Sequence, residues 1–181
     1  MADELLTPRL RLRRWRADDL GALAEIFAKE EVWRFPFGRG LTPDETAAFL
    51  DRRLRTQELR GSSPAAAEDR ATGKLIGYIG LSVPEWLPEV LPAVEIGWRL
   101  DPPSWGRGLA TEGAQAALAH AFTELRLSQV ISIYKPENVA SGRVMEHLGM
   151  ALDHETRHPV FALALRVLRL TRGEWEVRGA R

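Results

Sequence analysis

Residues 95–112 have the sequence Glu95-Ile-Gly-Trp-Arg-Leu-Asp-Pro-Pro-Ser-Trp-Gly-Arg-Gly-Leu-Ala-Thr-Glu112. The apolar first part predicts a buried strand over residues 93–100, which Pro102 and Pro103 end. An amphipathic helix is predicted from Gly108 to about Thr123. Backbone N–H groups in such a turn point together at the positive end of a helix dipole. The stretch therefore predicts an anion site, most naturally a phosphate site.

The bulk composition narrows the class of protein. The chain has 181 residues, no net charge at pH 7 and no cysteine. This length suits one α/β or α+β domain. Zero net charge disfavours a nucleic-acid partner, and the absence of cysteine excludes disulfides and a thiol nucleophile.

Two further classes are disfavoured by pattern. The four histidines show no spacing typical of a metal site, so no metal is expected. No run approaches the ~20 apolar residues that span a bilayer, and the N-terminus lacks the features of a signal peptide. We expect a cytoplasmic protein without a membrane partner.

The hydrophobic periodicity predicts a mixed sheet. Strand patterns occur at 10–15, 64–69, 74–83, 93–100, 129–134, 151–157 and 161–171. Helices are predicted to start near residues 18, 43, 108 and 138. A strand, a helix of about 16 residues and a second strand form a βαβ unit, so 93–100 and 129–134 should be parallel neighbours.

The glycine-bearing turn Trp105-Gly-Arg-Gly-Leu-Ala110 differs from other phosphate motifs. It lacks the Gly-Lys-Ser/Thr ending of a Walker A loop, and it is not G-x-G-x-x-G. Binding of a nucleoside triphosphate or a dinucleotide is therefore disfavoured. Taken alone, the two glycines are equally consistent with an ordinary strand-to-helix turn.

The motifs around the turn are more specific. Glu-Ile-Gly-Trp on a strand, the turn Trp105-x-x-Gly108-x-Ala110 and Asn138-x-x-Ser141 opening the next helix follow one another in this order. The order resembles the GNAT superfamily of acetyl-CoA-dependent N-acetyltransferases, whose turn motif is Gln/Arg-x-x-Gly-x-Gly/Ala. Residues 7–15, 138–150 and 168–175 are similar to its ribosomal-protein-alanine N-acetyltransferase-like branch, in which Trp at the first turn position is typical.

The resemblance covers nearly the whole chain and implies a fold. It implies an α+β (mixed α/β), GNAT-like single domain over residues 1–181. A central mixed sheet of six or seven strands is expected, with parallel, splayed strands 4 and 5 and about four flanking helices.

The resemblance also implies acetyl-CoA as cosubstrate. The backbone of residues 107–110, with Thr111 close by, would hold the pyrophosphate, and the pantetheine arm would lie along residues 98–100. The Arg107 side chain either adds charge or is merely solvated, whereas Asn138 can both cap its helix and bind the pantetheine. The expected cofactor-binding set is Trp98, Arg99, Leu100, Trp105, Gly106, Arg107, Gly108, Leu109, Ala110, Thr111, Asn138 and Ser141.

Transfer to an amine needs a proton acceptor, donors for the oxyanion and a donor for the departing thiolate. The resemblance implies Glu95 as the base, directly or through a water, and a structural ion pair with an arginine is the alternative. A backbone N–H near Arg99 is the expected oxyanion donor. Ser141 or Tyr134 could donate to the sulfur, although Tyr134 could instead be a buried strand residue.

The sequence says least about the amine that accepts the acetyl group. Trp33, Phe35, Phe37 and Trp86 lie on predicted loops and could line its groove, fill the core or form a dimer contact. The expected reaction is direct attack in a ternary complex by a primary amine, either a protein N-terminal α-amine or a small-molecule amine. A non-catalytic acyl-CoA-binding sensor or partner module is the alternative, and a homodimer is left open.

Overall fold

A computed structural model describes residues 4–35, 37–60 and 64–179. Within these residues one eight-stranded mixed sheet forms, in the order β1-β2-β3-β4-β5-β6-β8-β7. Its neighbouring strands are antiparallel, apart from the parallel pair β5 and β6. The strands are β1 (Glu4–Leu6), β2 (Leu10–Arg13), β3 (Ala65–Asp69), β4 (Leu75–Ser82), β5 (Glu95–Leu100), β6 (Gln129–Tyr134), β7 (Ala151–Arg157) and β8 (Ala164–Thr171).

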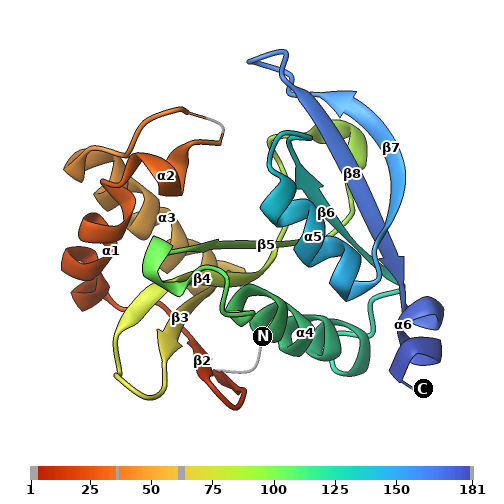
Figure 1. Cartoon of the computed structure of the whole chain (residues 1–181), viewed down its shortest axis with the longest axis horizontal. Coiled ribbons are helices and arrows are strands. Elements are labelled where there is room, and N and C mark those ends of the chain that lie inside the picture. The colour runs from red at the N-terminus through yellow and green to blue at the C-terminus, as the bar shows by residue number, and fades with distance from the viewer. Residues whose placement is uncertain (1–3, 36, 61–63, 180–181) are drawn as a thin grey trace.

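Six α-helices, counted over the same described residues, accompany the sheet. Helices α1, α2 and α3 gather at one end of the molecule, and β7, β8 and α6 lie at the other (Figure 1). The helices are α1 (Leu20–Phe27), α2 (Glu30–Trp33), α3 (Pro43–Arg60), α4 (Leu109–Thr123), α5 (Val139–Leu148) and α6 (Arg172–Gly179). The short 3-10 helices are η1 (Ala17–Asp19), η2 (Pro88–Val90) and η3 (Pro102–Ser104).

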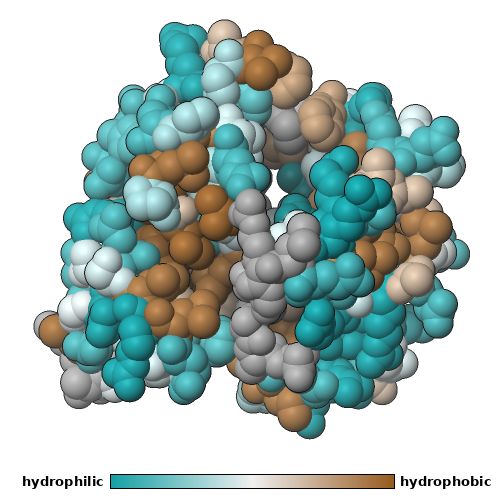
Figure 2. All heavy atoms as spheres, turned by 180° about the vertical axis from the view of Figure 1, so that it is seen from behind, coloured by the Kyte–Doolittle hydropathy of each residue, from teal (hydrophilic) through white to brown (hydrophobic). Residues whose placement is uncertain are grey.

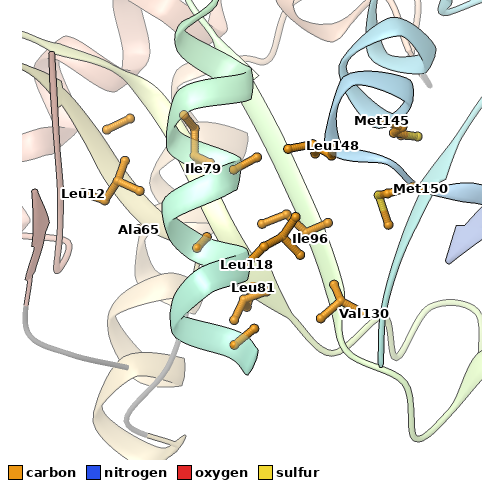
Figure 3. Close-up of a cluster of buried hydrophobic side chains, with 14 of the residues drawn as sticks. Leu12, Ala65, Ile79, Leu81, Ile96, Leu118, Val130, Met145, Leu148 and Met150 are labelled. Carbon is orange, nitrogen blue, oxygen red and sulfur yellow. The ribbon is translucent and has the colours of Figure 1, made fainter. Parts of the chain in front are cut away.

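Helix α4 packs closely on the sheet. The face that meets the sheet carries small, fully buried residues: Ala114, Ala117 and Ala121. Figure 3 shows Leu118 of this helix near Ile96 of β5 in the main hydrophobic core. A Cβ atom on Gly113 would lie 2.5 Å from Cδ1 of Ile79, so a larger residue there would require the Ile79 side chain to move. This packing fixes the start of α4 against the sheet.

A second core, rich in aromatic side chains, lies on the opposite face of the sheet beneath α1–α3. Strand β3 shows the division, because Ala65 and Ala67 belong to the first core and Ala66 to the second. The Phe27 ring makes edge contacts with Trp33 and Phe49 of this cluster, each at 5.0 Å between centroids. The cluster holds α2 and α3 at one end of the sheet.

Strands β5 and β6 are paired only where they begin. Their one register pair is Glu95 with Ile131, and the Ser132 hydroxyl donates to the Ile96 carbonyl at 2.8 Å. Beyond this point β5 stays with β4, whereas β6 follows β8 along all six of its residues. The sheet therefore opens between the C-terminal ends of two parallel strands.

The predicted mixed fold and the parallel pairing of 93–100 with 129–134 are confirmed. Among the described residues the structure adds β1, α2 and α6 to the predicted elements. Strand β1 has only three residues, too few for a periodic pattern. Helix α6 follows a capping box that the sequence does contain, since Thr171 N–H and Oγ1 both donate to the Glu174 carboxylate.

Candidate active site

A groove of about 1780 Å³ crosses the molecule where β5 and β6 part. Its walls are formed by α2 and α3 on one side, by α5 on the other, and by the turn at residues 104–111. Seen from behind, the molecule is hollowed between its two halves, with hydrophobic residues gathered on one side (Figure 2). Its volume exceeds the roughly 300–1,000 Å³ of an ordinary single-ligand pocket.

The turn before α4 has the backbone geometry that the predicted anion site requires. Gly106 and Gly108 have φ values of 69° and 74°, in the left-handed region that glycine adopts without strain. Gly108 is the N-cap of α4, and its carbonyl accepts from the N–H of Glu112 at 3.0 Å. The N–H groups of Leu109, Ala110 and Thr111 precede this first helical bond, so they are available to phosphate oxygens.

A set of contacts from the connection between β1 and β2 supports the turn. The Glu112 carboxylate accepts from Thr7 Oγ1 at 2.5 Å, from Arg9 N–H at 2.8 Å and from Arg9 Nε at 2.6 Å. Arg9 Nη1 also donates to the Arg107 carbonyl at 2.7 Å. Burial raises the pKa of Glu112, but the hydrogen bonds from Thr7 and Arg9 outweigh it and keep that pKa below its ordinary value. Sequence reasoning assigned no role to these residues, because the contacts span about 100 positions.

Two side chains of the turn have defined positions. Trp105 lines the groove, and its indole N–H donates to the Leu100 carbonyl at 2.7 Å. The Arg107 guanidinium lies 3.6 Å from the Asp69 carboxylate. Its backbone belongs to the turn, while its side chain is directed to β3.

The free edge of β5 faces the opening between the strands. The Asp101 N–H donates to Ile76 of β4 at 2.8 Å. Because hydrogen-bonding direction alternates along a strand, Arg99 also points its N–H at β4, whereas Trp98 and Leu100 point theirs toward β6. The N–H groups of Trp98 and Leu100 are therefore the donors near Arg99 that a ligand in the groove can reach.

Glu95 lies at the first residue of β5, at the point where the two strands part. Burial raises its pKa to about 7, although the positive charge of Arg53 and the N–H of Ile133 oppose the rise. Among the described residues no arginine or lysine forms an ion pair with Glu95 within 4.0 Å. A carboxyl group with this pKa can accept a proton near neutral pH.

The start of α5 forms the facing wall. Asn138 is the N-cap, as predicted, and its Oδ1 accepts from the Ser141 N–H at 3.3 Å. The amide NH2 of Asn138 remains available to a ligand. A Cβ atom on Gly142 would lie 3.1 Å from the Tyr134 ring, so Tyr134 packs beside the first turn of α5. Ser141 and Tyr134 both line the groove.

The predicted substrate-side aromatics all line the groove: Trp33, Phe35, Phe37 and Trp86. Trp33 stacks on Phe37 at 5.5 Å, and Phe37 meets Phe161 at 6.4 Å. Phe161 contacts His158, which stacks on Trp86 at 5.0 Å. A chain of rings therefore joins α2 to the β7–β8 hairpin across one end of the groove.

The described residues contain neither a cluster suited to a metal ion nor a helix suited to a membrane. No group of three or more histidine, aspartate or glutamate side chains there could hold a metal ion. No helix in the described ranges is long and apolar enough to cross a membrane.

Comparison with known proteins identifies the family. The model of the acetyltransferase (GNAT) domain matches residues 9–151. The uncharacterized N-acetyltransferase YnaD of Bacillus subtilis is 28% identical over 146 residues, which are 81% of each chain. The chain therefore belongs to the GNAT acetyltransferase family and is an N-acetyltransferase.

Solved structures agree with this fold. An acetyltransferase (GNAT family) from Bacillus anthracis superposes with a TM-score of 0.79 at 24% identity, over 94% of this chain and 99% of that one. A ribosomal-protein-S5-alanine acetyltransferase from Vibrio fischeri gives 0.75 at 16% identity, over 95% and 98%. At these identities the likeness shows the fold alone.

Proposed function

We propose that the protein transfers an acetyl group from acetyl-CoA to a primary amine, with both substrates in the groove at once. The observation that carries this proposal is the position of Glu95. A carboxyl group with a pKa of about 7 lies where β5 and β6 part. The glycine turn at the start of α4 lines the same groove and supports the proposal with a place for an anion.

The parts of acetyl-CoA match the donors along the groove. The N–H groups of residues 109–111 and the bare Gly106 and Gly108 backbone suit the pyrophosphate. The open edge of β5 at Trp98 and Leu100 suits the amides of the pantetheine arm, which would lie there like an added strand. Asn138 would donate from the opposite wall.

The chemistry follows from the residues at the opening. Glu95 accepts a proton from the acceptor ammonium, directly or through a water, because only the neutral amine carries a lone pair. The amine nitrogen then attacks the thioester carbonyl and a C–N bond forms. As the tetrahedral intermediate collapses, the C–S bond breaks, the nitrogen loses its second proton and the departing thiolate gains one. The N–H of Trp98 or Leu100 donates to the oxygen on which negative charge develops.

The departing thiolate needs a proton or a hydrogen bond. Ser141 and Tyr134 both border the groove near the start of α5. We assign the role to Ser141, since it lies on the helical turn that opens onto β5, and we keep Tyr134 as the competing donor.

The acceptor is a primary amine, either the α-amine of a protein N-terminus or a small molecule. A thiol-release assay with acetyl-CoA separates these classes if it uses N-terminal peptides, aminoglycosides and polyamines in parallel. The proposal expects acceptor-dependent thiol release with at least one class. Tight binding of acetyl-CoA without release for any amine would favour the non-catalytic acyl-CoA-binding module instead.

A further inference from the structure

Arg53 is a cation in the groove wall that has aromatic neighbours but no anionic partner among the described residues. It lies near the middle of α3 and lines the groove. Its Nε is buried without a hydrogen-bond acceptor, and none of the described residues pairs with its charge within 4.0 Å. Its guanidinium carbon lies 4.7 Å from the Phe49 ring centroid and 6.0 Å from that of Tyr78. Burial of an unpaired cation is unfavourable.

Other shielded guanidinium groups in the described chain do have partners. Arg13 contacts Asp19 at 2.7 Å and Glu68 at 2.8 Å. Arg99 donates to the carbonyls of Val32 and Phe35. The lack of a partner at Arg53 is therefore a property of its position on the groove, and it suggests that a ligand supplies the anion.

Arg53 and Glu95 both line the groove and interact electrostatically. Burial lowers the pKa of Arg53, and the negative charge of Glu95 opposes this. Gly97 has its α-carbon on the same face of β5 as Glu95. No heavy atom lies within 4 Å of the place that a Cβ on Gly97 would occupy. This opening leaves room for an acceptor beside the proposed base.

A second unpartnered donor lies in the same wall. The indole Nε1 of Trp33 is buried without a hydrogen-bond acceptor, and Trp33 lines the groove. Two unpartnered donors, one of them on a cation, suit a negatively charged ligand group that only accepts hydrogen bonds. A carboxylate matches the planar fork of a guanidinium by forming two parallel N–H···O bonds.

We propose that the acceptor is a small amino-carboxylate, an amino acid or a close derivative, whose carboxylate binds Arg53 while its amine faces Glu95. This inference rests on the proposed function and narrows its acceptor. A polyamine would bring like charge to Arg53. An ordinary peptide N-terminus has an amide where the free carboxylate of an amino acid would be.

The test compares matched acceptors that differ only in charge: glycine with glycinamide, methionine with methioninamide and phenylalanine with phenylalaninamide. The kcat/KM for the carboxylate member of at least one pair should exceed that for the amide about 10- to 100-fold. Arg53→Gln should abolish this preference, because the carboxylate member of each pair then loses its cationic partner, whereas any change at Glu95 acts on both members alike. The amine of the amide is a weaker base than that of the amino acid, so the two members differ in reactivity without any help from Arg53. The ratio of their kcat/KM values in Arg53→Gln measures that difference and is the reference for the wild-type ratio.

Arg55→Gln is the matched control, since Arg55 lies on the same helix, is exposed and pairs with Asp51 at 2.6 Å. It should keep the preference. Arg53→Met should be folded and should melt at a higher temperature than the wild type, because it removes an unpaired buried cation. Equal rates for both members of every pair, or a preference that survives in folded Arg53→Gln, would overturn the inference.

Failure of the proposed function gives a different result. If acetyl-CoA binds but no amine is acetylated, the transfer reaction is wrong. Binding of the same amino acids and amides to the CoA complex, measured by calorimetry, then decides the inference. Carboxylate-specific binding that Arg53→Gln removes supports it, and the absence of such binding overturns it.

Discussion

Glu95→Gln should have opposite effects on activity and on stability. The amide cannot accept the proton of the acceptor ammonium, so kcat/KM should fall about 100- to 10,000-fold. In the wild type the rate should rise with pH through an apparent pKa near 7, the value to which burial raises Glu95. The variant should lose this rise in its pH–rate profile and keep only the rise that comes from deprotonation of the acceptor amine.

The stability effect follows from the same pKa. The folded protein keeps a proton on Glu95 up to about pH 7, whereas the unfolded chain loses it near the ordinary value of 4.5. Between these values the folded state binds more protons, so the free energy of unfolding falls as pH rises. Above pH 8 the buried charge should cost about 1–3 kcal/mol. Glu95→Gln removes it and should raise Tm by about 2–10 °C at pH 8, with little change at pH 4.5.

The assay pairs thiol-release rates with thermal unfolding across pH 4.5–9. Glu176→Gln is the control, because Glu176 is an exposed glutamate on α6 and does not line the groove. It should change neither rate nor Tm. An unchanged rate and pH profile in Glu95→Gln would refute Glu95 as the base. A Tm difference that does not depend on pH would refute the raised pKa.

Four other substitutions test the proposed anion site, the donor to the sulfur and a buried ion pair. Gly108→Val should weaken acetyl-CoA binding at least about tenfold in calorimetry and cost about 1–2 kcal/mol, since valine is strained at a φ of 74°; unchanged affinity would contradict the pyrophosphate assignment. Ser141→Ala should lower kcat more than Tyr134→Phe, with Km for acetyl-CoA little changed, and the reverse order would transfer the role to Tyr134. Arg13→Met should destabilise by about 3–5 kcal/mol in denaturant unfolding, because it leaves the Asp19 carboxylate buried without its cation; a loss below 1 kcal/mol would show that the pair matters little.

The sequence was informative at several places where a local pattern specifies structure. The apolar run at 93–100, its glycine turn and the N-cap Asn138 are local signals, and each lies in the structure where it was predicted. The parallel pairing followed from the length of the connecting helix. Catalytic roles for Glu95, Ser141 and Tyr134 came from the family resemblance, and they stay predictions.

Contacts between residues far apart in the chain could not be predicted from the sequence. Nothing in the spacing of Thr7, Arg9 and Glu112 indicates that they meet behind the anion site. Arg53 is one of four arginines within residues 52–60, and only the fold shows that it lacks a partner in the groove. The chain of rings through His158 and Phe161 likewise joins segments more than 100 residues apart. Such features depend on tertiary packing, which periodicity does not encode.

The central claim is that the groove passes an acetyl group from acetyl-CoA to an amine. Its most direct test uses acetyl-CoA labelled in the acetyl group, a panel of amines that includes amino acids and peptides, and separation of the quenched products. The account predicts that the label appears in an amine, with one acetylated amine for each thiol released, and that Glu95→Gln greatly slows its appearance. Label that stays in acetyl-CoA, or that appears only in acetate or on the protein, would contradict it.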